Sequence, residues 1–236
     1  MRPIIKKLLL NTHGIVRNGL VAEYRFNEGA GQVLYDYRSN NNGQLGSAAG
    51  ADTNDPTWTA GGLTFATDDY CAMPVPFNVN ENWAVYIAGK RDGNPSVEWG
   101  EAFCSMGIST GSNPQLYVFK GSTGFLRFYV HTGTFEAYVT FDTFPAGFNM
   151  LVAKRNGDNY TLKNLTTGQV GAFVRSGTLT GVDVCTLGVR RRNALDLYLN
   201  GEISYYLPYS RATSDAEDTQ NYRALKTILA GRGVSI

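Results

Sequence analysis

Hydrophobic and polar residues alternate in short runs along most of the chain, a pattern typical of strands with one buried face. In residues 20–26 the even positions are Leu, Ala, Tyr and Phe, whereas Glu23 and Arg25 lie on the opposite face. Five later runs show similar patterns: 82–88, 115–120, 124–130, 134–141 and 147–155. We therefore predict a fold made mainly of antiparallel strands.

Turn signals separate these runs. The chain has 27 Gly, spread over its whole length. Asn156-Gly157 lies between the apolar runs 151–155 and 159–163, which predicts a hairpin with a type I′ turn. We expect Asn200-Gly201 to turn the chain in the same way.

One segment departs from the strand pattern. Ser214 and Glu217 have the spacing of a capping box, and apolar side chains then recur at helical spacing up to Leu229, just before Gly231. The sequence therefore predicts a short C-terminal helix over residues 214–229.

Composition and charge narrow the possible fold classes and the kinds of partner. A chain of 236 residues with 43% hydrophobic and 12% aromatic residues folds, and its length fits one all-β domain. The net charge of +1 gives no general attraction for nucleic acid or an anionic membrane, so we expect neither as a partner. No apolar run approaches the ~20 residues of a membrane span, and we recognise no secretion signal.

The three cysteines, Cys71, Cys104 and Cys185, show no metal-binding spacing. We expect buried, reduced thiols, with an intersubunit disulfide as the alternative.

Residues 1–18 are basic and apolar, unlike the rest of the chain, and we predict an N-terminal arm followed by a β-sandwich domain over residues 19–236. Its characteristic side chains are Arg2, Ile4, Ile5, Lys6, Lys7, Leu8, Leu9 and Leu10. Such an arm, left exposed, invites association. We expect it to lie across a neighbouring subunit of a homo-oligomer, and the alternative is that it folds back over its own sandwich.

Three segments, in order, resemble a known family. Residues 20–31 (LVAEYRFNEGAG), with Asp36 and the Asn/Gly turn at 42–46, look like the opening of concanavalin A-like, laminin-G-like domains. Trp58, residues 61–65 and residues 68–74 are similar to the family's next segment, and residues 187–188, 201–204 and 209–213 resemble its closing segment. The resemblance implies a two-sheet antiparallel jelly-roll sandwich of the concanavalin A-like lectin/glucanase type.

The opening and the basic arm look most like laminin-G-like proteins of tailed bacteriophages. That resemblance implies a non-enzymatic virion component, such as a head decoration, a head or neck fibre or a tail-associated protein, with other virion proteins as partners. The alternative is a lectin-like adhesion module for host surface glycans. A polysaccharide hydrolase is a more remote alternative.

Catalytic residues are not evident. The E-x-D-x-x-E pattern of jelly-roll hydrolases is absent. Glu98 and Glu101 are three residues apart in a Gly-containing stretch, a spacing that does not place both carboxyl groups on one strand face. Glu202 is interpreted as a solvent-facing strand residue. His13 and His131 are the only histidines, and no G-x-S-x-G motif accompanies them. We therefore expect no enzymatic activity.

Sugar binding on a β-sandwich uses exposed aromatic rings and nearby polar groups. The candidates are Trp99, in a polar Gly-flanked stretch, and Tyr205, Tyr206 and Tyr209 near the C-terminal strand.

Calcium is the one cofactor that the resemblance allows. Relatives with this fold hold Ca²⁺ beside the first turn, where this chain has Asp36, Asn40 and Asn42. Asn and Asp also cap turns, so both roles stay open for these three residues.

Overall fold

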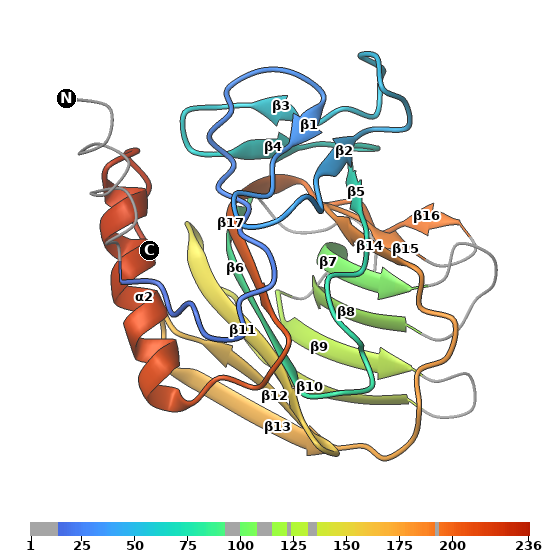
Figure 1. Ribbon diagram of the computed structural model, residues 1–236, viewed down its shortest axis with the longest axis vertical. Coiled ribbons are helices and arrows are strands. Elements are labelled where there is room, and N and C mark those ends of the chain that lie inside the picture. The colour runs from blue at the N-terminus through green and yellow to red at the C-terminus, as the bar shows by residue number, and fades with distance from the viewer. Residues whose placement is uncertain (1–13, 93–99, 108–114, 122–123, 132–135, 192–193) are drawn as a thin grey trace.

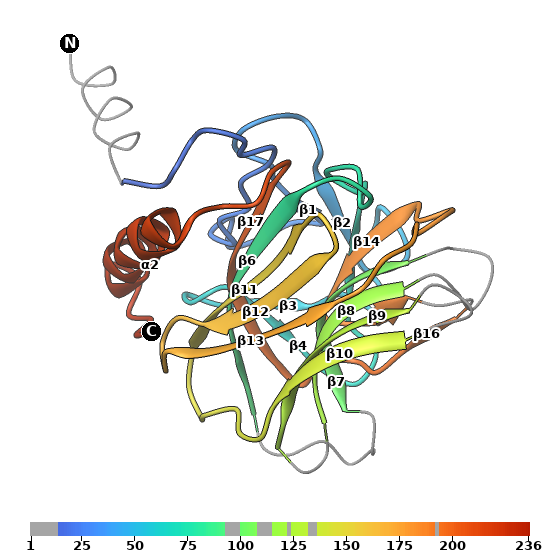
Figure 2. The ribbon, with the colours of Figure 1, turned by 90° about the horizontal axis from the view of Figure 1, so that it is seen from below.

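The computed structural model describes residues 14–92, 100–107, 115–121, 124–131, 136–191 and 194–236. Two large antiparallel sheets pack face to face, and the one helix of the described residues lies outside one of them (Figures 1 and 2). The predicted all-β jelly-roll sandwich with a C-terminal helix is therefore confirmed. Within the described residues, no helix is both long and apolar enough to span a bilayer.

The first large sheet, sheet A, has seven strands in the order β13-β12-β11-β6-β17-β4-β3. Their bounds are β3 (Thr57–Trp58), β4 (Leu63–Phe65), β6 (Trp83–Arg91), β11 (Asn149–Asn156), β12 (Asn159–Asn164), β13 (Gln169–Val174) and β17 (Gly201–Tyr209).

The second large sheet, sheet B, has eight strands in the order β1-β2-β5-β14-β7-β8-β9-β10. Their bounds are β1 (Val33–Leu34), β2 (Gly43–Leu45), β5 (Cys71–Met73), β7 (Glu101–Gly107), β8 (Gln115–Lys120), β9 (Leu126–His131), β10 (Glu136–Phe141) and β14 (Val184–Leu187). A separate small hairpin joins β15 (Arg190–Arg191) to β16 (Leu195–Asp196).

The main core lies between the two sheets. Large aromatic side chains fill it, among them Trp83, Phe103, Phe128 and Tyr206, and all of them are fully buried. A second apolar cluster joins the outer face of sheet A to the helix. The central strands β6 and β17 are therefore buried on both faces, whereas the pattern of run 82–88 predicts only one buried face.

The helix α2 (Asp215–Ala230) begins at the N-cap Ser214, and its capping box with Glu217 is formed. The predicted helix is thus confirmed to within one residue. Figure 2 shows α2 along the outside of sheet A, on the side away from β8, β9 and β10.

The hairpin predicted at Asn156-Gly157 is confirmed, but its turn type is not. Asn156 pairs with Asn159, so Gly157 and Asp158 form the two-residue turn. Only Gly157 has a positive φ, 61°, which is the pattern of a type II′ turn with Gly in the first central position.

The prediction of a second turn at Asn200-Gly201 is wrong. Gly201 begins β17 and pairs with both Phe65 and Arg91. A Cβ added to Gly201 would lie 2.3 Å from the carbonyl oxygen of Lys90, so glycine is needed there for close strand packing.

The first predicted strand, residues 20–26, does not form a continuous ladder with a neighbouring strand. It pairs through isolated bridges, Leu20 with Tyr209 and Tyr24 with both Tyr206 and Asp36. The apolar face is buried as predicted. Glu23, however, is buried as well, because Arg17, Arg25 and Tyr205 surround its carboxylate.

All three cysteines are free and fully buried. Burial raises the pKa of the Cys185 thiol to about 12, despite a hydrogen bond with Tyr206. An intersubunit disulfide is therefore excluded in this fold, because no sulfur reaches the surface.

Part of the predicted arm belongs to the folded domain. Ile15 and Val16 are buried in the apolar cluster under α2. The Val16 N–H donates to Asn221 Oδ1 over 2.9 Å, and the Tyr209 hydroxyl donates to the Val16 carbonyl over 2.8 Å. The arm residues from Arg2 to Leu10 lie outside the described part of the chain.

Candidate functional site

The two sheets differ in what covers their outer faces. Helix α2 lies over sheet A, and the Tyr86, Tyr209 and Leu207 side chains beneath it are buried. On sheet B the strands β9 and β10 carry exposed and half-buried side chains on their outer face. The described residues of β9 and β10 therefore offer an accessible sheet surface.

The alternation of strand β9 places its side chains on two faces. Leu126, Phe128 and Val130 point into the core and are fully buried. Arg127, Tyr129 and His131 consequently lie on the outer face. On β10, Tyr138 is the register partner of Tyr129 and shares this face.

Three rings form a row across this surface, which we call the ring row: His131, Tyr129 and Tyr138. The Tyr129 ring is nearly parallel to the Tyr138 ring, with centroids 6.2 Å apart, and to the His131 ring at 6.1 Å. Tyr138 is 47% exposed, whereas Tyr129 is only 7% exposed. Tyr129 thus lies between the other two rings, and Tyr138 is the more accessible of the two tyrosine rings.

Charged groups flank the ring row on both sides. The Arg127 guanidinium lies 4.1 Å above the Tyr138 ring centroid and 4.6 Å from that of Phe125, and its Nε donates to Thr140 Oγ1. On the other side, the Tyr129 hydroxyl donates to Glu136 Oε2. Donors and acceptors therefore stand beside an apolar ring surface, the combination that sugars require.

The β15–β16 hairpin borders the ring row. The Arg191 N–H donates to Ser105 Oγ of β7, and Leu197, just after the hairpin, packs with Ala102 and Tyr129. Leu197 also lines a hollow of about 340 Å³ together with Gly100, Tyr198 and Asn200. The ring row and this hollow together define the candidate site.

Of the four aromatic residues predicted to bind sugar, three are buried. Tyr206 points into the main core, and Tyr205 and Tyr209 lie under α2. The prediction is wrong for these three, because the helix and the second sheet cover both faces of β17. Trp99 lies outside the described residues, immediately before Gly100 of the hollow.

Two of the residues predicted to bind calcium, Asp36 and Asn42, organise a turn. Asp36 Oδ1 accepts from the backbone N–H groups of Glu23 and Arg38, and Oδ2 accepts from Ser39 and Asn41. Asn42 Oδ1 accepts from the Asp36 N–H.

Burial on its own raises the pKa of Asp36, but the hydrogen bonds outweigh it and hold the pKa below its usual value. Asn40 is exposed. Within the described residues, no three His, Cys, Asp or Glu side chains gather as metal ligands would.

The carboxyl groups considered for hydrolysis are held by cations. Glu101 forms a buried ion pair with Arg91, with Nε–Oε2 and Nη2–Oε1 distances of 2.6 and 2.7 Å. Glu202 is also buried, contrary to the prediction, and lies 3.4 Å from Lys90 Nζ while accepting from Thr59 Oγ1. Glu98 lies outside the described residues.

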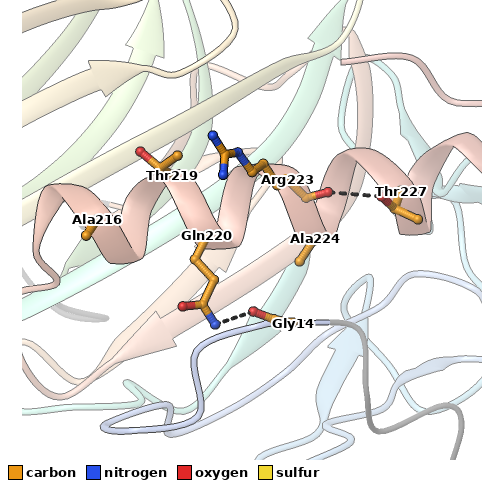
Figure 3. A pocket seen from close by; sticks show the side chains of 7 residues that line it. All are labelled: Gly14, Ala216, Thr219, Gln220, Arg223, Ala224 and Thr227. Atoms are coloured by element: carbon orange, nitrogen blue, oxygen red, sulfur yellow. Dashed lines mark hydrogen bonds between the residues drawn. The ribbon is translucent and has the colours of Figure 1, made fainter.

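A further hollow of about 570 Å³ lies beside α2 (Figure 3). Gln220 Nε2 donates to the Gly14 carbonyl across it, and the Thr227 hydroxyl donates to the Arg223 carbonyl. Among the described residues, no carboxylate or aromatic ring lines this hollow. It therefore lacks the ring surface that a sugar site uses, and the Gln220 contact attaches residue 14 to the helix.

The alternation of apolar and polar residues in the sequence already indicates part of the ring row. Runs 124–130 and 134–141 are predicted strands, and their period of two already places Arg127, Tyr129 and Tyr138 opposite the core residues. What the sequence lacks is the register that brings Tyr138 beside Tyr129, since that depends on strand pairing.

No family model and no curated protein matches the chain. Solved structures do. A sialidase of Trypanosoma rangeli, in complex with 2,3-difluorosialic acid, is 13% identical and aligns with a TM-score of 0.65 over 89% of this chain and 33% of its own. The chain thus spans about a third of that protein.

A variant of the NanB sialidase of Streptococcus pneumoniae is 15% identical, with a TM-score of 0.53 over 63% of this chain and 26% of its own. At this level of identity the likeness concerns the fold alone. The fold and its neighbours define the class: the chain is a two-sheet antiparallel jelly-roll β-sandwich.

Proposed function

We propose that this protein is a carbohydrate-binding module that holds glycans on the ring row of sheet B. The observation that carries the proposal is the exposed Tyr138 ring, fixed beside Tyr129 and flanked by Arg127 and Glu136. A sugar packs against the exposed part of such a ring, while the guanidinium and carboxylate groups order its hydroxyls.

The lectin-like interpretation is preferred over a hydrolase. Binding requires a ring surface and polar neighbours, both of which the ring row has. Hydrolysis requires two carboxyl groups facing each other across the sugar. Glu101 and Glu202 are instead engaged by Arg91 and Lys90.

The virion role and the virion location implied by the resemblance to phage proteins stay predictions. Neither solved structure described above is a phage protein. A glycan-binding sandwich is compatible with display on a particle, so the proposed function does not depend on the location.

A glycan array with the isolated protein tests the proposal, and sialylated glycans belong in the panel because of the ligand held by the Trypanosoma rangeli sialidase. We expect the Tyr138→Ala variant to bind its best glycan at least tenfold more weakly, a loss of about 1.4 kcal/mol.

The matched control is Tyr35→Ala. Tyr35 is 51% exposed, but it follows β1 at the opposite edge of sheet B, roughly 30 Å away at ~4.8 Å per strand. Its variant should bind as the wild type does. Equal losses in the two variants, or no bound glycan at all, would contradict the proposal.

A further inference from the structure

A second hollow, away from the ring row, is rich in arginine. It has a volume of about 350 Å³ and is lined by Arg17, Glu23, Arg25, Tyr37 and Arg38. We call it the arginine hollow. It lies where the segment 17–25 runs beside β17 and meets the turn that follows β1.

Glu23 is the one acidic residue among the described residues that line this hollow, and its hydrogen-bonding capacity is largely used. Oε1 accepts from Arg25 Nε over 2.9 Å and from the Tyr205 hydroxyl over 2.7 Å, and Oε2 accepts from Arg17 Nη1. Burial alone raises the pKa of Glu23, but these hydrogen bonds outweigh it and lower the pKa. Glu23 therefore stays ionised at neutral pH.

Each arginine is held in place by at least one contact and keeps other donors. Arg25 stacks on the Tyr37 ring, with its Cζ 4.4 Å from the centroid, and Arg38 Nε donates to the Leu20 carbonyl. In the described part of the chain, the two Nη atoms of Arg25 and of Arg38 and the Nη2 atom of Arg17 have no hydrogen-bond partner. Three guanidinium groups against one carboxylate leave a formal charge of +2 in the lining.

The Asp36 carboxylate, next to Tyr37 in sequence, is not hydrogen-bonded to these guanidinium groups in the described structure. Asp36 is buried, and both of its oxygens accept hydrogen bonds from Ser39 and from backbone N–H groups. The remaining donors of the arginine hollow are therefore unmatched within the described structure.

We propose that the arginine hollow binds an oxyanion: a carboxylate or phosphate group carried by a ligand. Planar guanidinium groups with free N–H pairs match such oxygens in bidentate fashion, and side chains already fixed lose little entropy on binding. The site is separate from the ring row, since it lies beside β17 of sheet A rather than on β9 and β10.

Titration with sodium glucuronate and with inorganic phosphate tests this site, and neutral glucose serves as the uncharged control. Binding is followed by the NMR signals of the arginine Nε–Hε groups. We expect at least one of the two anions to shift the signals of Arg25 and Arg38, and glucose to leave them unchanged. A response to glucuronate alone identifies a sugar carboxylate as the ligand group, a response to phosphate alone identifies a phosphate, and a response to both identifies the shared oxyanion chemistry.

Two variants with the same change of charge make the test specific. Arg38→Gln removes a lining guanidinium without exposing Glu23 and should weaken anion binding at least fivefold. Arg223→Gln, at an exposed position on α2, should leave it within twofold. Should Arg38→Gln not fold, Arg38→Lys keeps the charge but removes the planar fork, and it should also weaken binding.

The proposal is overturned by any of three results: neither anion shifts the arginine signals, glucose shifts them equally, or the Arg38 and Arg223 variants lose affinity to the same extent. The last result would indicate general attraction to a basic surface.

Discussion

Glu23 illustrates how burial changes the role of a single residue. Its position opposite an apolar strand face predicts a solvated side chain, yet it is buried and receives hydrogen bonds from Arg17, Arg25 and Tyr205. Arg25 and Arg17 are two and six residues from Glu23, but Tyr205 is 182 residues away, so no local pattern indicates the complete set of donors. The result is a carboxylate that must be ionised for the fold to be fully stable.

We therefore predict that Glu23→Gln lowers the free energy of unfolding by about 1–3 kcal/mol at pH 7, because a buried hydrogen-bonded charge is removed. The pKa of Glu23 is lowered in the folded state, so its contribution is present above the unfolded pKa of about 4.5. That contribution is lost as the pH falls through the lower, folded value.

Urea denaturation at pH 7 and at pH 3 measures both effects, and the gap between wild type and variant should narrow at pH 3. Glu81→Gln, at an exposed position, is the control and should stay within ~0.5 kcal/mol of the wild type. A Glu23→Gln protein as stable as the wild type at pH 7 would refute this account.

At the scale of elements, α2 decides which sheet face is available for function. It docks through an apolar cluster and through one buried carboxylate, that of Asp218. This group accepts from Lys154 and Lys163 on neighbouring strands and from the Tyr86 and Thr213 hydroxyls. Burial lowers the pKa of Lys154, while its pairing with Asp218 acts in the opposite direction.

We expect Asp218→Asn to cost about 3–5 kcal/mol of unfolding free energy, because it leaves two lysines near a buried site without their counter-charge. The side chain of Asp215, which also bridges Lys163, is 90% exposed. Asp215→Asn should therefore cost no more than about 1 kcal/mol. Thermal unfolding of the two variants side by side measures the difference, and similar losses would contradict a central role for Asp218.

The elements also show what the sequence can and cannot predict. The capping box of Ser214 and Glu217 locates α2, and alternation locates most of the long strands, because these signals are local. The burial of Tyr205 and Tyr209 is not local: it follows from where α2 packs. For the same reason the sequence suggests the wrong aromatic residues, and Tyr138 emerges only when the pairing of β9 with β10 is known.

At the scale of the whole molecule, the folded unit begins before the predicted domain boundary. Ile15 and Val16 are buried against α2, and the Val16 backbone bonds to Asn221 and Tyr209. A protein truncated to start at Gly19 should therefore lose roughly 3–6 kcal/mol, at about 1.5–3 kcal/mol for each buried side chain.

A protein that starts at Gly14 keeps these contacts and is the matched comparison. Differential scanning calorimetry should give a clearly lower Tm for the shorter protein than for the one that starts at Gly14. Equal Tm values would contradict the packing of residues 14–18 on the helix.

The fold as a whole presents two different surfaces, a helix-covered sheet A and a sheet B whose outer face carries the ring row. The sequence predicts the sandwich but not this asymmetry, which depends on tertiary packing of α2. The asymmetry leads to the central claim that glycans bind on β9 and β10.

The most direct test of that claim is to map the contact. A backbone amide NMR titration of the protein with its best glycan from the array reports which residues respond. The account predicts that the largest shifts fall on Arg127, Tyr129, His131 and Tyr138, with little change along α2. Shifts concentrated on α2 or on β3 and β4, with β9 and β10 unaffected, would contradict it.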